Sequence, residues 1–112
     1  MELKVRKNEE IYIIDILGEM DLYNSYKLKE LLLKMVEKKI EKFIINMEEV
    51  EYIDSSGIGA LIYITSTVKK MDLRLAIVNV QGSVKKVIEL TKLTNFFPIF
   101  PNLEEAIKSM EN

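Results

Sequence analysis

Two short apolar runs constrain the fold of this chain more than any other feature of the sequence. Residues 43–47 (Phe-Ile-Ile-Asn-Met) and 73–80 are mostly apolar, without the alternation expected of a strand that has one face in water. Strands of this kind are typical of parallel sheets, in which helices cover both faces. The sequence therefore predicts an α/β protein whose central strands are parallel.

Segments with helical periodicity separate and follow these runs. In each of them, apolar residues recur every three or four positions, which predicts a helix with one buried stripe. The stripe of the third predicted helix includes Leu90. The four segments are residues 28–40, 58–68, 84–90 and 103–110.

The first part of the chain predicts a β-hairpin. Residues 3–7 alternate, residues 11–17 are rich in Ile, and three polar residues separate them. The expected order is ββαβαβαβα, a mixed sheet with an N-terminal antiparallel hairpin and then alternating parallel strands and helices. The last strand, residues 96–100, contains Pro98 and is expected at an edge of the sheet. From its length, we expect the chain to form a single domain over residues 1–112.

Polar residues with capping side chains predict where the helices begin. Residues 48–53 are expected to form a loop before the second helix, with Val50 and Ile53 turned inward. A side-chain oxygen at the position before a helix accepts a hydrogen bond from a free backbone N–H group. The expected caps are Asp21 or Asn24 for the first helix, Ser83 for the third and Asn102 for the fourth.

Composition excludes several classes of function. The chain has no His and no Cys, so it lacks the usual general base, the usual zinc ligands and a Ser-His-Asp triad. Its net charge of −2 comes from well-mixed charges, which predicts no direct contact with nucleic acid. No apolar stretch has the length of a membrane span or a signal peptide. We therefore expect a cytoplasmic protein that is not an enzyme and has no metal or cofactor. Abundant Lys, Glu and Ile are typical of thermophiles.

Residues 54–59 (Asp-Ser-Ser-Gly-Ile-Gly) depart from ordinary helix chemistry. They stand at a predicted junction between a strand and a helix that spans about 57–70. Gly57 and Gly59 fall in the first turn, where each costs about 1 kcal/mol relative to Ala. They have two explanations, which are compatible: close packing of the helix start against the sheet, or bare backbone that lets another protein approach the serines.

The two serines suggest a site of modification. Asp54, Ser55 and Ser56 are predicted to cap the helix, but a cap needs only one hydroxyl. The spare serine would lie at the carboxyl end of a parallel strand, where open α/β sheets place functional sites. Phosphorylation of Ser55 would add about −1.5 to −2 charges, which free N–H groups at the helix start would tolerate. Asp54, and Asp21 if it folds nearby, would repel the phosphate, so recognition would change while the fold survives.

These residues resemble the signature of the anti-sigma factor antagonists, the small bacterial STAS domains. In that family, as here, the 54–59 motif follows a Phe-Ile-Ile-Asn strand and a loop, and residues 18–21 (Gly-Glu-Met-Asp) resemble its Gly-Glu-Leu-Asp motif. The order of elements is similar along the whole chain. The departures are Ile53, where Met is frequent, and residues 71–72 (Met-Asp), which replace a glycine turn.

The resemblance implies a STAS-like fold and a partner-switching function. The unphosphorylated protein would bind an anti-sigma factor, commonly also a serine kinase of the histidine-kinase-like ATPase type, and would thereby release sigma. Phosphorylation of Ser55 would switch it off, and Asp21 would assist phosphorylation or partner contact. We expect a monomer or weak dimer that binds neither membrane nor nucleic acid. The switch loop would be formed by Asp21, Asp54, Ser56, Gly57 and Gly59.

Other functions stay open. A stressosome-type scaffold subunit would have the same fold and would form a large assembly. A phosphoacceptor of the response-regulator type would use Asp54, but it needs a pair of acids after the first strand to hold Mg²⁺, and this chain opens with a hairpin instead. Weak nucleotide binding at the helix start is a further alternative, because anions suit helix N-termini.

Overall fold

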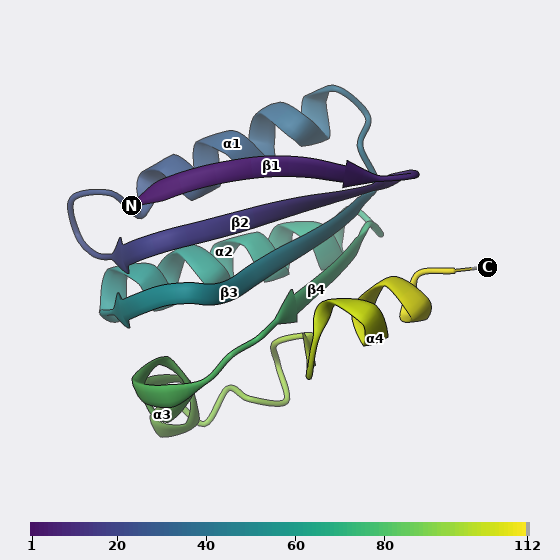
Figure 1. Cartoon of the computed structure of the whole chain (residues 1–112). Coiled ribbons are helices and arrows are strands. Elements are labelled where there is room, and N and C mark those ends of the chain that lie inside the picture. Colours follow the sequence, from purple (N-terminus) through teal and green to yellow (C-terminus); the bar gives the residue numbers. More distant parts are fainter. Residues whose placement is uncertain (112) are drawn as a thin grey trace.

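The computed structural model describes residues 1–111 and confirms the predicted order ββαβαβαβα (Figure 1). The strands and helices alternate after the first two strands, as the alternation of apolar runs and helical stripes predicted. The elements are β1 Glu2–Asn8, β2 Ile11–Met20, α1 Tyr26–Glu37, β3 Lys42–Ile53, α2 Ser55–Lys70, β4 Arg74–Val78, α3 Gly82–Leu90, β5 Ile99–Phe100 and α4 Leu103–Ser109.

The five strands form one mixed sheet in the order β1-β2-β3-β4-β5. β1 and β2 are the predicted antiparallel hairpin, and every other neighbouring pair is parallel. β5 lies at the edge, as Pro98 predicted, but it is shorter than the expected strand over 96–100. The backbone N–H groups of Phe96 and Phe97 both donate to the carbonyl of Leu93, so these two residues belong to a turn.

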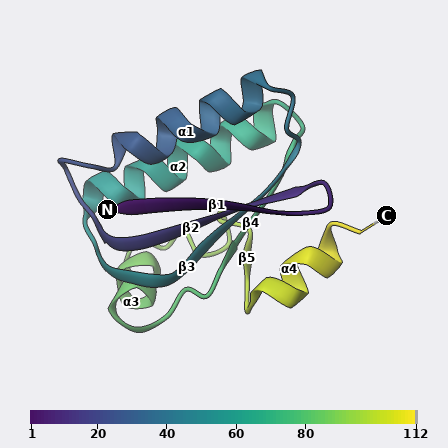
Figure 2. The same cartoon turned by 45° about the horizontal axis from the view of Figure 1, so that its top comes forward.

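The sheet lies between two helical layers (Figure 2). Helices α1 and α2 cover one face, α4 lies on the other, and α3 lies beside the carboxyl-terminal end of β3. Along β3, Phe43 and Ile45 pack into the larger core cluster, with α1 and α2, whereas Ile44 packs into the smaller cluster with α4. Burial on both faces explains why the 43–47 run has no alternation.

The predicted loop over residues 48–53 is wrong, because β3 continues without interruption to Ile53. β4 ends opposite Asn46, so the second half of β3 pairs with β2 alone, as far as Met20 opposite Ile53. Val50 and Ile53 are buried as expected, while three exposed glutamates, Glu48, Glu49 and Glu51, gave the segment the polar composition of a loop. The second half of β3 therefore leads directly to the start of α2.

A bulge marks the point where β3 leaves β4. Asp15 of β2 faces Asn46, but Leu17 faces Glu49, so β3 has one more residue than β2 between these pairs. The Asn46 side chain is buried and stabilises the bulge, because its Oδ1 accepts hydrogen bonds from the Glu48 N–H, at 3.1 Å, and from Asn79 Nδ2, at 2.9 Å. Such bulges redirect the end of a strand.

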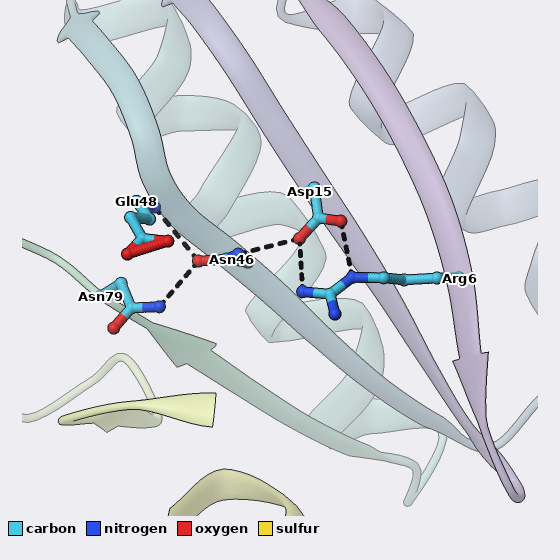
Figure 3. Close-up of polar contacts among 5 residues, drawn as sticks. All are labelled: Arg6, Asp15, Asn46, Glu48 and Asn79. Carbon is cyan, nitrogen blue, oxygen red and sulfur yellow. Dashed lines mark hydrogen bonds and ion pairs between the residues drawn. The ribbon is translucent and has the colours of Figure 1, made fainter. Parts of the chain in front are cut away.

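A polar network continues from Asn46 across the sheet (Figure 3). Asn46 Nδ2 donates to Asp15 Oδ1 at 2.8 Å, and the Arg6 guanidinium of β1 donates to both Asp15 oxygens, at 2.7 and 3.1 Å. Burial of Asp15 raises its pKa, but the hydrogen bonds from Arg6 and Asn46 outweigh that effect, and the pKa lies below its ordinary value of 3.8. The network therefore links β1, β2 and β3 to the bulge.

Two further helix starts can be compared with their predicted caps. Asn102 caps α4 as expected, and its Oδ1 accepts from the Glu105 N–H at 2.9 Å. Ser83 is not a cap, because α3 already begins at Gly82, and Gln81 precedes it without a side-chain capping bond. Gly82 has a φ of 59°, a left-handed value that favours glycine. The chain therefore turns into α3 at Gly82, one residue before Ser83.

The network predicts a pH-dependent contribution of Asp15 to stability. Because the pKa of Asp15 is lower in the folded protein than in the unfolded chain, its stabilisation is complete above 3.8 and is lost as the pH falls through the folded value. Asp15→Asn should lower the free energy of unfolding by about 1 kcal/mol at pH 7, and by less at pH 3. Urea unfolding at both values tests this, with the exposed Glu89→Gln as control. A difference that does not shrink at pH 3 would contradict it.

Candidate functional site

The carboxylate of Asp54 begins α2. Its Oδ1 accepts hydrogen bonds from the backbone N–H groups of Ser56, at 2.8 Å, and Gly57, at 3.2 Å. The helix therefore starts at Ser55, two residues earlier than predicted, and the serines lie in its first turn instead of capping it. Two of the N–H groups expected to be free for a phosphate, those of Ser56 and Gly57, are already hydrogen-bonded to Asp54.

The two serines differ in exposure. Ser55 is exposed at the first position of α2, whereas Ser56 is half-buried and its N–H group is held by Asp54. The start of α2 lies at the carboxyl-terminal edge of the sheet, next to the end of β3 (Figure 1). An enzyme that acts on this edge would reach Ser55 more readily than Ser56.

Gly57 and Gly59 have different explanations: close packing explains Gly57, whereas Gly59 leaves exposed backbone. Gly57 is buried, and a Cβ added to it would lie 2.6 Å from Cγ1 of Ile53 and 2.9 Å from both Cβ and the carbonyl oxygen of Met20. Close packing against the strand ends therefore requires glycine at position 57. Gly59 is exposed, and an added Cβ would meet nothing within 4 Å, so the fold itself places no steric demand on this position.

Asp21 lies in the turn that follows β2, beside the start of α2. The Asp54 N–H donates to the carbonyl of Met20 at 3.1 Å, which joins the end of β2 to the helix start. Asp21 and Asn24 do not cap α1, which begins at Tyr26. Instead, Asn24 Oδ1 accepts from the Asp21 N–H, and Asp21 Oδ1 accepts from the N–H two residues on, both at 2.9 Å. The two sequence motifs therefore meet at one edge.

Several exposed apolar side chains near this edge were missed in the sequence. Leu90, predicted to be buried, is 82% exposed, because it follows Ile88 by two residues and so leaves the stripe of α3. Leu22 and Tyr23 in the turn after β2, and Tyr52 near the end of β3, are also exposed. The spacing within the 84–90 segment was the available signal for Leu90.

A groove of about 340 Å³ runs between α2 and α3 and includes the exposed serine; we call it the α2–α3 groove. Most of its lining is apolar, and both helices contribute to it. Its residues include Ser55, Ile58, Gly59, Ile62, Val87 and Leu90.

Residues 1–111 contain neither a cluster of metal ligands nor a membrane-spanning helix. No group of three or more Asp, Glu, His or Cys side chains in this part of the chain is arranged to hold a metal ion. None of the helices described is both long enough and apolar enough to cross a membrane.

Comparison with known proteins identifies the family. The family model described as STAS domain matches residues 2–106. The chain belongs to the STAS domain family. This result confirms the resemblance and the STAS-like fold predicted from residues 18–21, 43–47 and 54–59.

Individual relatives agree with the family assignment. This STAS domain is 24% identical over 99 residues to the anti-sigma-B factor antagonist of Staphylococcus aureus (strain NCTC 8325 / PS 47), a match that covers 88% of this chain and 92% of that protein. The crystal structure of an anti-sigma factor antagonist from Mycobacterium paratuberculosis matches with a TM-score of 0.88 at 21% identity, over 99% of this chain and 94% of that one. The Bacillus cell fate determinant SpoIIAA in its phosphorylated form matches with a TM-score of 0.74 at 20% identity, over 98% and 100% of the two chains.

The two glycines of this STAS domain should respond in opposite directions to the same substitution. Gly57→Ala should lower the free energy of unfolding by about 1–3 kcal/mol, because its methyl group overlaps the buried ends of β2 and β3. Gly59→Ala should raise it by up to about 1 kcal/mol, because alanine favours a helix and the space is open. Urea unfolding of both variants measures the difference. Equal effects of the two substitutions would contradict the assignment.

Proposed function

We propose that this STAS domain is an anti-sigma factor antagonist that is switched by phosphorylation of Ser55. When unphosphorylated, it binds an anti-sigma factor that is also a serine kinase of the histidine-kinase-like ATPase type, and sigma is released. When phosphorylated, it no longer binds. The observation that carries the proposal is the exposed Ser55 hydroxyl at the start of α2, on the edge where Asp21 and Asp54 also lie.

The surroundings of Ser55 favour it over its neighbours as the phosphoacceptor. Ser56 is half-buried, so a kinase would have to reach further into the fold. The Asp54 Oδ1 atom is engaged with two backbone N–H groups, which argues against its use as an acceptor of the response-regulator type. Ser55 alone among the three combines exposure with a hydroxyl nucleophile.

The electrostatics of the helix start explain how a phosphate would act as a switch. Phosphorylation adds about −1.5 to −2 charges beside the Asp54 carboxylate. The N–H groups of Ser56 and Gly57 already bond to that carboxylate, so they do not neutralise the phosphate. The phosphate would stay exposed on the surface, repelled by Asp54, and would alter the face that a partner meets. Because Ser55 is exposed, the phosphate would not enter the apolar core beneath α2, so the fold would survive.

The partner and setting follow from the same proposal. The names of the curated relatives, anti-sigma-B factor antagonists, support an anti-sigma factor as the partner. We propose that the protein acts by binding and not by catalysis, as a monomer or weak dimer in the cytoplasm, where sigma factors work. The switch loop of the proposal comprises Asp21, Asp54, Ser56, Gly57 and Gly59.

Phosphorylation by the anti-sigma factor kinase of the same genome tests the proposal. With ATP, the kinase should place one acid-stable phosphate on Ser55, located by mass spectrometry. Ser55→Ala should abolish the modification, whereas Ser56→Ala, the matched control, should retain it. Ser55→Asp should weaken binding to the kinase by about tenfold or more, equivalent to about 1.4 kcal/mol. Phosphorylation of Ser55→Ala at the parent rate would show that the site is elsewhere.

A further inference from the structure

A second cavity, of about 280 Å³, lies toward the carboxyl-terminal end of α2, away from Ser55. It is found where the sheet is incomplete. β5 pairs with β4 only at Ile77 and Val78, so within residues 1–111 no strand lies beside the first residues of β4 on that side. Helix α2 contributes to the cavity from one face of the sheet and the end of α4 from the other (Figure 2). The volume is close to the lower limit for pockets that bind small molecules, about 300 Å³.

Most of the wall of this cavity is apolar. The apolar side chains come from α2, from the start of β4, from the chain around β5 and from the end of α4. A wall of this kind favours a ligand with an apolar body, because contact with it removes apolar surface from water. The residues are Val68, Leu73, Leu75, Pro98, Phe100 and Met110.

Two cations and no carboxylate complete the lining. Lys69 and Arg74 are exposed, which places their charges at the mouth of the cavity, and within residues 1–111 neither forms an ion pair. Both are held by neutral groups instead. Lys69 Nζ donates to the Phe96 carbonyl at 3.0 Å, and the Arg74 guanidinium donates to the Ser109 carbonyl. Two fixed positive charges without a counter-charge favour an anion.

Thr65 supplies a buried hydroxyl that lacks a partner. The residue lines the cavity and is 1% exposed, and its Oγ1 makes no hydrogen bond within residues 1–111. Thr67 shows the usual arrangement in the same helix, because its Oγ1 donates to the Tyr63 carbonyl at 2.8 Å. A buried hydroxyl without a partner is unfavourable, and valine would fill the same space without that cost. Threonine in a helix has two common χ1 states, so rotation can bring the hydroxyl to a ligand in the cavity.

We infer that this cavity binds a small organic anion with an apolar body and a second oxygen that bonds to Thr65. The carboxylate of such a ligand would lie at the mouth, between Lys69 and Arg74, and its body would lie against the apolar wall. A phenolic acid such as 4-hydroxyphenylacetate has all three parts and serves as the probe. The inference does not rest on the proposed function, because the cavity lies away from Ser55.

Compounds that each lack one part of the probe test the three contacts. Phenylacetate lacks the hydroxyl, 4-methylphenol lacks the carboxylate, and acetate lacks the ring. Calorimetric titration of the whole chain should give a dissociation constant at least about fivefold higher for each of them than for 4-hydroxyphenylacetate, because each leaves one feature of the cavity unmatched. Equal binding of phenylacetate and 4-hydroxyphenylacetate would remove Thr65 from the site and overturn the inference.

Thr65→Val isolates the hydroxyl. The variant keeps the shape of the side chain and removes the unpaired polar atom, so its melting temperature should equal or exceed that of the parent. It should bind 4-hydroxyphenylacetate about fivefold more weakly and phenylacetate as the parent does, so the preference between the two acids disappears. Misfolding cannot explain this result in a protein of equal or greater stability. Thr67→Val is the matched control and should keep the preference, because Thr67 does not line the cavity.

Lys69→Gln and Arg74→Gln test the charges. Each should weaken the binding of both aromatic acids about fivefold or more and leave the binding of uncharged 4-methylphenol unchanged. Lys70→Gln is the matched control, because Lys70 is exposed in the same turn of α2 but does not line the cavity. Affinity of the parent for the acids should also fall as salt rises.

Two further results would contradict the inference. If the parent binds none of the four compounds, the cavity is not a site for this class of ligand. If the parent binds 4-hydroxyphenylacetate but Thr65→Val, Lys69→Gln and Arg74→Gln bind it equally well, the compound occupies another place on the protein. Neither result bears on the switch, because the phosphorylation assay on Ser55 decides the proposed function separately.

Discussion

The carboxylate and backbone of Asp54 hold together the three segments on which the site depends. Its N–H group donates a hydrogen bond to the end of β2, and its side chain accepts hydrogen bonds from the first turn of α2. Asp54 also directly follows the last residue of β3. Without this residue, the turn with Asp21 and the helix with Ser55 would lose their common anchor. The site is thus built by hydrogen bonds at an edge, and the apolar core below determines only where that edge lies.

The core residues show why the fold could be predicted and the helix starts could not. Both faces of β3 are covered, so Phe43, Ile44 and Ile45 are all buried. The resulting run of consecutive apolar residues can be recognised in the sequence. Capping depends on which of several nearby side-chain oxygens reaches a backbone N–H group. The positions of Asp21, Asn24 and Ser25 in the sequence do not show which of them does so. The prediction succeeded at Asn102, where one capping residue directly precedes the helix.

The candidate site was predicted in its residues but not in its surroundings. The motif over residues 54–59 identified an exposed serine, yet the groove beside it depends on α3, about thirty residues further along the chain. The length of β3 was missed for a related reason. Its second half pairs on one side alone, and its exposed glutamates resemble a loop when the pairing with β2 is unknown. Contacts between distant segments were the missing information in both cases.

The hairpin places β1 at one edge of the sheet. β1 has seven residues, and its outer backbone groups have no neighbouring strand among residues 1–111. Such an edge is a template for pairing with other molecules, and charged side chains on it are a common protection against aggregation. Lys4, Arg6 and Lys7 occupy this strand. Replacing them to simplify the surface would expose the protein to edge-to-edge polymerisation.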